Sequence, residues 1–263
     1  MKHVFLRELK LNLKQILIWS LTVGLLGFVS ILLYSSMQGD MKSMADMFSS
    51  MGAFSDAFGM STLSIATIEG YFATEIGVIH GLGSAMFAAI TAIVILSKEE
   101  ERHTGEFLLS LPLSRSRVLF AKGLCVFVGL VLFTIICGLL YVAAFAGLGE
   151  GLTASELMKF LLLELLMNVE VASVCFLVSA VSTRIKMGLG LGLALIFYVY
   201  DLMGRVVPDL KDYLFIGPFS YANASEILSG KEAEPAAFLI AAAVILISAG
   251  AAVFVYNKRD LVS

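Results

Sequence analysis

The run VLFAKGLCVFVGLVLFTIICGLLYVAAFAGL, residues 118–148, decides the fold class of this chain. It contains a single charged residue, Lys122. About 20 consecutive apolar residues in a helix cross the roughly 30 Å of hydrocarbon in a bilayer. The run therefore predicts a membrane-spanning helix, because the alternating strands of a transmembrane β-barrel would not give an unbroken apolar run.

Five further runs of the same kind flank it, and the composition of the whole chain agrees. Hydrophobic residues make up 59% of the 263 residues and charged residues 15%, with a mean hydropathy of +0.93. Soluble domains contain about half apolar and a quarter charged residues. We expect an all-α membrane protein in which residues 1–263 form one transmembrane domain of six helices. The other predicted spans are 16–37, 71–96, 157–183, 187–207 and 235–256.

The basic residues gather on one side of the predicted spans. Most of the 18 Lys and Arg residues lie in residues 1–15, the loop 97–117, residues 184–186 and the C-terminal end. Cytoplasmic loops carry an excess of Lys and Arg. We therefore expect a multi-pass protein of the cell membrane with both termini and the 97–117 loop in the cytoplasm. The net charge of -3 hides this locally basic face.

Residues 1–15 have apolar side chains at near-helical spacing, with basic residues between them. Phe5, Leu9 and Leu13 form the apolar set. A helix of this kind lies in the membrane interface with its cations among the lipid headgroups. We predict an N-terminal interfacial helix; the alternative is a simple extension next to the first span.

Residues 38–70 are predicted to lie outside and carry a stripe of Met and Phe at spacings of three or four residues, which indicates one apolar helix face. Such a face adapts to a membrane or a partner subunit. The alternative is a soft-metal site for Cu(I). The three cysteines lie inside predicted spans without metal-ligand spacing, so we expect no metal centre. The stripe consists of Met37, Met41, Met44, Phe48, Met51, Phe54 and Phe58.

The loop between the second and third spans has the most ordered polar pattern in the chain. Negative charge is unfavourable near the C-terminus of a helix. The three acids at 99–101 therefore indicate that the second helix continues beyond the membrane. Residues 106–111 form a short apolar-rich helix that Pro112 ends. Ser114 is a favourable N-cap for the next helix. The loop therefore predicts a short cytoplasmic helix held between two spans.

The sequence ERHTGEFLLSLPLSR at residues 101–115, followed by Lys122, resembles the loop between helices two and three of ABC-2 type transporter permeases. Those sequences commonly read E-x-x-x-G-T-x-E-x-L-L-S-L-P-V-S-R with a Lys several residues on. Here Thr104 precedes Gly105, which reverses the usual order. The ending YNKRDL at residues 256–261 also resembles the end of that family, and the length and span layout agree with it.

The resemblance implies that this loop is a coupling helix seated in a separate ATPase subunit. It also implies two copies of that cytoplasmic ATPase, with ATP and Mg bound there, and a second permease copy or paralogue. The chain has no G-x-x-x-x-G-K-[ST] motif to hold ATP phosphates, so we expect no bound cofactor and no enzymatic activity of its own. We expect lipid, and no nucleic acid, among the other partners. The implied contact residues are Arg102, Thr104, Glu106, Leu108, Leu109 and Arg115.

Several polar residues lie within or near the apolar spans, where ionisable groups mark function unless they are paired or hydrated. They are Glu75, His80, Glu164, Asn168 and Glu170. One hypothesis is a substrate or cation path through Glu164, Asn168 and Glu170. The other, which we favour, is that these groups bond to neighbours or face a wet outer vestibule. Glu170, nearest the midplane, is the best single candidate for a contact with substrate or a partner helix.

The sequence alone leaves three classes of function open. The first is the permease subunit of an ATP-driven exporter. The second is a stand-alone membrane channel or scaffold, which needs no ATPase. The third is an intramembrane protease or lipid transferase, disfavoured because the acids at 99–101 lack the required spacing and His80 is the only histidine in a predicted span.

Overall fold

Helices build the part of the chain that the structure describes. This computed structural model describes residues 2–49, 51–101 and 114–258. Within those ranges it contains no strand, and six helices are long and apolar enough to cross a membrane. The predicted all-α fold with six spans is therefore confirmed. The six helices are α1 (Lys2–Ser49), α4 (Gly77–Glu101), α6 (Arg115–Leu148), α7 (Ala154–Val181), α8 (Met187–Val206) and α11 (Pro235–Lys258).

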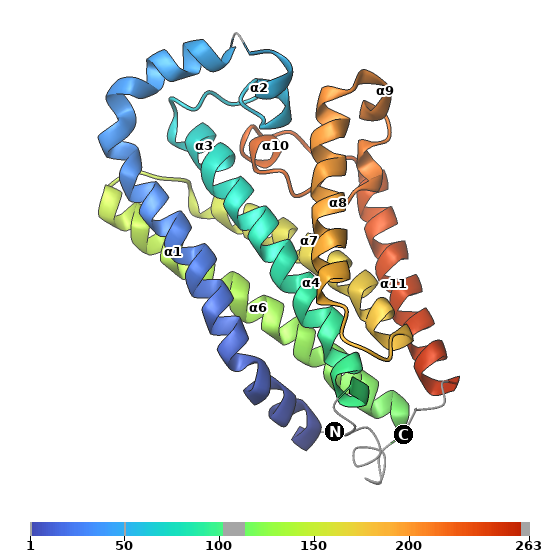
Figure 1. Ribbon diagram of the computed structural model, residues 1–263. Coiled ribbons are helices and arrows are strands. Elements are labelled where there is room, and N and C mark those ends of the chain that lie inside the picture. Colours follow the sequence, from blue (N-terminus) through green and yellow to red (C-terminus); the bar gives the residue numbers. More distant parts are fainter. Residues whose placement is uncertain (1, 50, 102–113, 259–263) are drawn as a thin grey trace.

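Short helical elements gather at one end of the bundle, at the top of Figure 1. We call this the far end. The opposite end, which we call the loop end, is where α1 begins, α4 ends, α6 begins and α11 ends (Figure 1). The far-end elements are α2 (Ala53–Ala57), α3 (Ile68–Tyr71), a π-helical turn (Phe72–Ile76), α9 (Pro208–Lys211), a 3-10 turn (Leu214–Ile216) and α10 (Ala224–Leu228).

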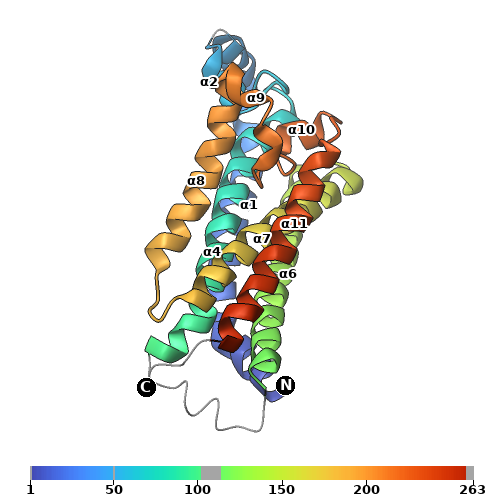
Figure 2. The ribbon, with the colours of Figure 1, turned by 90° about the vertical axis from the view of Figure 1, so that its right-hand side faces the viewer.

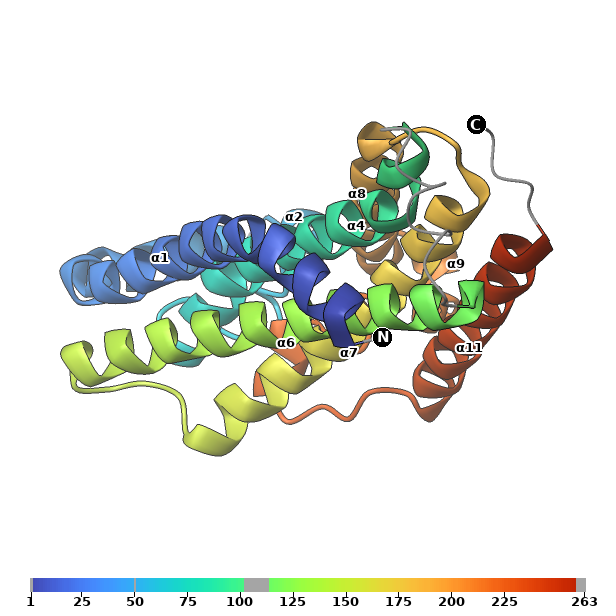
Figure 3. The ribbon, with the colours of Figure 1, turned by 90° about the horizontal axis from the view of Figure 1, so that it is seen from below.

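The two central helices are α4 and α7. Helix α1 packs along α6, α4 packs against α7 and α8, and α11 packs against α7. Viewed along the bundle, α1 and α6 lie on one side and α8 and α11 on the other (Figure 3). In the span Ile68–Glu99, which contains most of α4, 61% of the most apolar 18-residue stretch is buried. In α11 the corresponding share is only 17%. Small residues on α4, such as Ala85, Ala88 and Ala92, allow this close approach.

An aromatic cluster fills the interior between α1, α4, α6 and α7. Tyr141 and Phe133 of α6 and Phe160 of α7 are fully buried. Phe72 meets the rings of Tyr141 and Phe160 edge-on, with centroids 5.9 Å and 5.3 Å away. A methyl group on Gly27 of α1 would lie 2.4 Å from Tyr141, so glycine is needed for the close contact between α1 and α6.

The first span differs from the prediction in length. The predicted N-terminal helix is present from Lys2, but it continues without a break into the first span, and that helix runs to Ser49 instead of ending at residue 37. The Met and Phe stripe is not on one helix, so that prediction is wrong. The chain turns at Gly52, which has φ of 50°, before α2 begins, and the rings of Phe48 and Phe54 stack across the turn with centroids 6.0 Å apart.

The connection from α8 to α11 returns into the bundle. It contains the short helix α10, capped by Asn223, whose Oδ1 accepts a hydrogen bond from Glu226 N at 3.2 Å. Gly230 follows it with φ of 78°, the left-handed conformation that commonly ends a helix. Because α10 contacts α3, α4, α7 and the π-helical turn, this connection closes the far end of the bundle (Figure 1).

Candidate functional site

The loop end gathers the boundaries of several spans around the connection between α4 and α6. Of the six residues expected to contact an ATPase, Arg115 is described, and it is the first residue of α6. Its Nη1 donates to the Asn257 carbonyl at the end of α11, at 3.5 Å. Ser114 stands at the predicted N-cap, but its side chain makes no capping hydrogen bond.

The other five implied contact residues lie outside the described residues, as does the helix predicted over residues 106–111. They are Arg102, Thr104, Glu106, Leu108 and Leu109.

Four charged side chains lie buried immediately inside this end, and we call them the loop-end cluster: Glu8, Lys98, Glu99 and Lys122. Lys98 Nζ lies 2.5 Å from Glu8 Oε2, and Lys122 Nζ lies 2.6 Å from Glu99 Oε1 and 3.6 Å from Glu8 Oε1. Lys122 is fully buried, and the side chain of Glu8 is 6% exposed. Because two acids face two bases, α1, α4 and α6 meet here in a cluster with balanced charge.

Side chains from α6 and α7 also form hydrogen bonds with the backbone of α4 beside this cluster. Lys122 Nζ donates to the Ile95 carbonyl at 2.7 Å. From α7, Ser179 Oγ accepts from the backbone N–H groups of Leu96 and Ser97, at 3.1 Å and 3.2 Å. The last turns of α4 leave the axis of the rest of the helix (Figure 2), and side chains that insert into a helical hydrogen-bond ladder are one cause of such a change of direction.

Among the predicted intramembrane residues, His80 belongs to the aromatic interior. It is fully buried on α4, and its Nδ1 lies 2.9 Å from the Tyr141 hydroxyl. Its Nε2 has no hydrogen-bond partner. The rings of Phe133 and Phe160 lie on either side, with centroids 5.7 Å and 5.4 Å away. These surroundings place His80 in packing between α4, α6 and α7.

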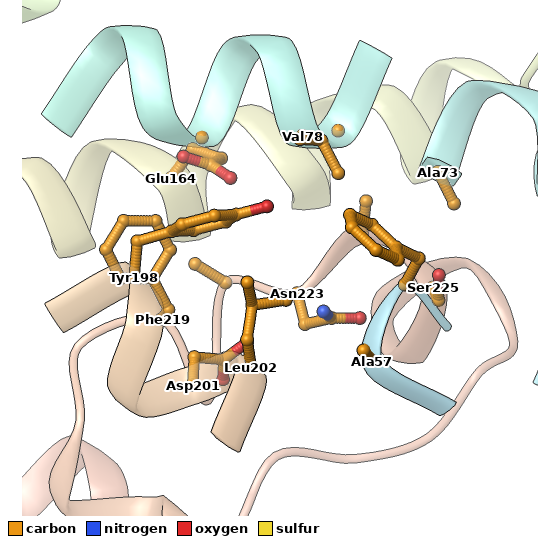
Figure 4. A pocket seen from close by; sticks show the side chains of 15 residues that line it. Ala57, Ala73, Val78, Glu164, Tyr198, Asp201, Leu202, Phe219, Asn223 and Ser225 are labelled. Carbon is orange, nitrogen blue, oxygen red and sulfur yellow. The ribbon is translucent and has the colours of Figure 1, made fainter. Parts of the chain in front are cut away.

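Glu164 and Asn168 occupy neighbouring turns of α7 and are both buried. Glu164 Oε2 accepts from Ser84 Oγ at 3.4 Å, and Asn168 Oδ1 has no hydrogen-bond partner among the described residues. Glu164 also lines a cavity of about 40 Å³ with Tyr198 and Phe219 (Figure 4). A cavity of this size has room for water, so the Glu164 carboxyl borders a small chamber that Ala224 and Ser225 of α10 also line.

Glu170 contacts a different element from Glu164. Its Oε2 accepts from the Tyr221 hydroxyl at 2.6 Å, which ties α7 to the connection before α10. Burial, together with the Glu170 carboxylate, raises the pKa of the Tyr221 phenol well above its ordinary value, so the hydroxyl stays protonated and donates. Glu75, in contrast, is exposed at the far end. The structure thus brings Glu164 and Asn168 together and leaves Glu75, His80 and Glu170 in three other environments.

A wide cleft opens at the far end, beside a second group of charges. Arg205 Nε lies 2.8 Å from Asp201 Oδ2, and Arg205 Nη1 lies 2.9 Å from Glu226 Oε1. Lys231 Nζ lies 3.0 Å from the same Glu226 oxygen. We call these four residues the far-end cluster. Arg205, Glu226 and Lys231 line the cleft, whose volume is about 790 Å³.

The electrostatics of Glu226 follow from these contacts. Burial alone would raise the pKa of its carboxyl, but the charges and hydrogen bonds of Arg205 and Lys231 outweigh burial and hold the pKa below its ordinary value. In the described ranges, no three His, Cys, Asp or Glu side chains approach closely enough to hold a metal ion. The far-end cluster is therefore a set of ion pairs at the mouth of a cleft.

Sequence reasoning did not identify the loop-end cluster. The family motif includes Lys122, but local pattern predicts no partner for Lys122 or for Glu8. Two signals were available: Lys122 is the one charge in a long apolar run, and Glu8 is an acid in a basic segment. Both patterns indicate a charge that requires a partner from another helix.

The comparisons with known proteins agree with this architecture. A family model described as ABC-2 family transporter protein matches residues 3–261. No curated protein matches the chain. The matched segment includes all six helices that could span a membrane and both charge clusters. The chain belongs to the ABC-2 transporter family and is a membrane component of a transporter, not itself a catalytic subunit.

Proposed function

We propose that this chain is the permease subunit of an ATP-driven exporter, coupled to a separate ATPase through the connection between α4 and α6. The observation that carries the proposal is the loop end itself. The ends of α4 and α11 and the start of α6 meet there, tied by Arg115 and Asn257. Glu101, the last residue of α4, accepts from Ile185 N at 2.6 Å, which adds the turn between α7 and α8.

This arrangement suits the transfer of mechanical work from a soluble partner. A force applied between α4 and α6 would reach the two central helices, because α4 packs against both α7 and α8. The chain has no motif for binding ATP phosphates, so the energy must come from another subunit. We propose two ATPase copies, which hold ATP and Mg, and a cytoplasmic loop end in the cell membrane, as the distribution of Lys and Arg favours.

The second permease copy or paralogue belongs to the same proposal. Helices α8 and α11 keep large apolar side chains exposed, among them Ile196, Leu239 and Leu246. Such faces suit lipid or a neighbouring helix. We propose that two permeases together enclose the substrate path.

We also propose that some of the intramembrane polar residues line this path. Glu164 and Asn168 have the best position for it, because Glu164 faces the small chamber and Asn168 has an unpartnered oxygen. Glu170 would act through Tyr221, whose side chain also lines the cleft. His80 and Glu75 have less support, since one is enclosed by aromatic rings and the other is exposed.

The test is ATP hydrolysis by the co-expressed ATPase in reconstituted membranes. The double variant Glu106→Arg with Leu109→Asp changes charge and apolarity in the implied coupling helix. We expect the wild-type pair to co-purify and hydrolyse ATP, and the double variant to lose assembly or stimulation. Glu232→Arg, an exposed charge reversal at the far end, is the matched control and should behave as wild type.

Two outcomes would contradict the proposal. If no ATPase associates with the wild-type chain, a stand-alone channel or scaffold becomes the better reading. If the double variant assembles and stimulates as well as the wild type, the connection between α4 and α6 is not the coupling element.

A further inference from the structure

The loop-end cluster holds the last turns of α4. Lys122 of α6 reaches both the Ile95 carbonyl and the Glu99 carboxylate of α4, at 2.7 Å and 2.6 Å. An ammonium group has three donors and no acceptor. The remaining side of Lys122 faces Glu8 of α1 at 3.6 Å. One fully buried side chain therefore joins three helices.

Several side chains hydrogen-bond to the α4 backbone within about one turn, between Ile93 and Ser97. In a regular helix each carbonyl accepts from the N–H four residues later. Here Lys122 also donates to the Ile95 carbonyl, and Ser179 also accepts from Leu96 N and Ser97 N. The Ser97 hydroxyl donates to the Ile93 carbonyl at 2.9 Å. These side chains stabilise a bent helix whose last turns run in a new direction (Figure 2).

The buried charges make this arrangement stiff. Removing one partner from a buried ion pair leaves an uncompensated charge, which is strongly destabilising. The cluster resists partial separation for the same reason: if Glu99 moved away from Lys122, two opposite charges would be left poorly solvated. The start of α6 and the last turns of α4 are thus held as one unit, with Glu8 and Lys98 attaching that unit to α1.

We propose that Lys122 and Glu99 are positioning residues for coupling: they clamp the bent end of α4 to α6, so that a displacement at the connection reaches the membrane part of α4 without being absorbed at the bend. This inference rests on the proposed function in one respect, that an ATPase delivers the displacement. The clamp exists in the permease alone and can be tested without the ATPase.

The key variant keeps the charge balanced. Lys122→Met alone leaves two carboxylates facing Lys98. Lys122→Met combined with Glu99→Gln leaves the Glu8–Lys98 pair intact and removes the clamp. A milder variant, Glu99→Asp, keeps all four charges and shortens one side chain by a methylene group. Arg117→Met and Glu150→Asp, which change exposed residues, are the matched controls.

The first measurement is hydrogen exchange of the α4 backbone in lipid nanodiscs, on the permease alone. We expect exchange at residues 96–101 to accelerate at least about fivefold in the balanced double variant, the factor that the net loss of one hydrogen bond produces. Glu99→Asp should show the same change to a smaller extent. The controls should match the wild type. Wild-type exchange rates in both cluster variants would overturn the clamp.

The second measurement is ATP hydrolysis with the co-expressed ATPase. If the clamp transmits displacement, the balanced variant keeps its ATPase bound but loses most of the stimulation, and Glu99→Asp loses part of it. A purely stabilising role predicts wild-type stimulation in every variant that folds, and that result would overturn the coupling role. If no ATPase binds even the wild type, the proposed function and the coupling role both fail, while the exchange data still decide the clamp.

Discussion

The two charge clusters lie at opposite ends of the same bundle and have opposite surroundings. In the loop-end cluster, the side chains of Lys122 and Glu8 are 0% and 6% exposed. In the far-end cluster, Arg205 is 8% exposed, but its partner Glu226 is 18% exposed, and Lys231 is 61% exposed. The loop-end charges reach the backbone of a neighbouring span, whereas the far-end charges border a cleft of about 790 Å³.

This difference distinguishes a rigid junction between helices from a contact that can rearrange. The loop-end side chains are between 0% and 12% exposed, so these ions depend mainly on one another and separating them is costly. Ions beside a wide cleft can exchange a partner for water at a modest free-energy cost. We therefore expect the loop end to fix the relative positions of α1, α4 and α6, and the far end to allow α8 and α10 to change their contact.

Lys122→Met should show the largest effect. Loss of the ammonium leaves Glu8 and Glu99 with only Lys98, and removing one partner of a buried ion pair costs about 3 to 5 kcal/mol. We expect a corresponding decrease in the free energy of unfolding of the purified permease, measured by chemical denaturation in mild detergent. Adding Glu99→Gln should restore part of it. Equal stability of Lys122→Met and the wild type would contradict the clamp.

Arg205→Met should have a smaller effect, although Arg205 has two acidic partners. The variant leaves Asp201, which is 5% exposed, without its base, but water from the cleft can replace part of what Glu226 loses. Hydrogen bonds to charged groups contribute about 1.5 to 3 kcal/mol. We expect a decrease in unfolding free energy within that range. If this variant is less stable than Lys122→Met under the same conditions, the far end is the more rigid of the two and the comparison is reversed.

The pH dependence of stability should come from the far end through Glu226. Its pKa is lower in the folded protein than in the unfolded chain, so its contribution is present above the unfolded value, about 4.3, and is lost as the pH falls through the folded value. Glu226→Gln should therefore be less stable than the wild type at neutral pH. Thermal unfolding at decreasing pH should show the two proteins converging below the ordinary range of a glutamate; a constant difference would exclude this cause.

Lys231→Ala should have the smallest effect. Its side chain is 61% exposed, and exposed ion pairs contribute at most about 1 kcal/mol. We expect a change in unfolding free energy near the limit of detection, which disappears at high salt because exposed pairs are screened. A larger effect that persists at high salt would mean that Lys231 is enclosed by a partner at the cleft.

Features that depend on one segment could be predicted from the sequence, whereas features that depend on distant segments could not. Apolar run length predicted six spans, since each run must cross the hydrocarbon. Local pattern failed for the Met and Phe stripe, because the turn at Gly52 divides it between two helices. It also did not separate Glu164 from Glu170, whose partners Ser84 and Tyr221 come from distant parts of the chain.

The sequence by itself determined that this is a six-span membrane protein with its basic residues on one side, because hydrophobic transfer and charge placement are properties of each segment alone. Only the tertiary structure decided that Glu8, Lys98, Glu99 and Lys122 meet, and that Lys122 reaches the backbone of α4 beside its bend. A buried charge requires a partner, but the helix that supplies it depends on how three separately stable spans pack against one another.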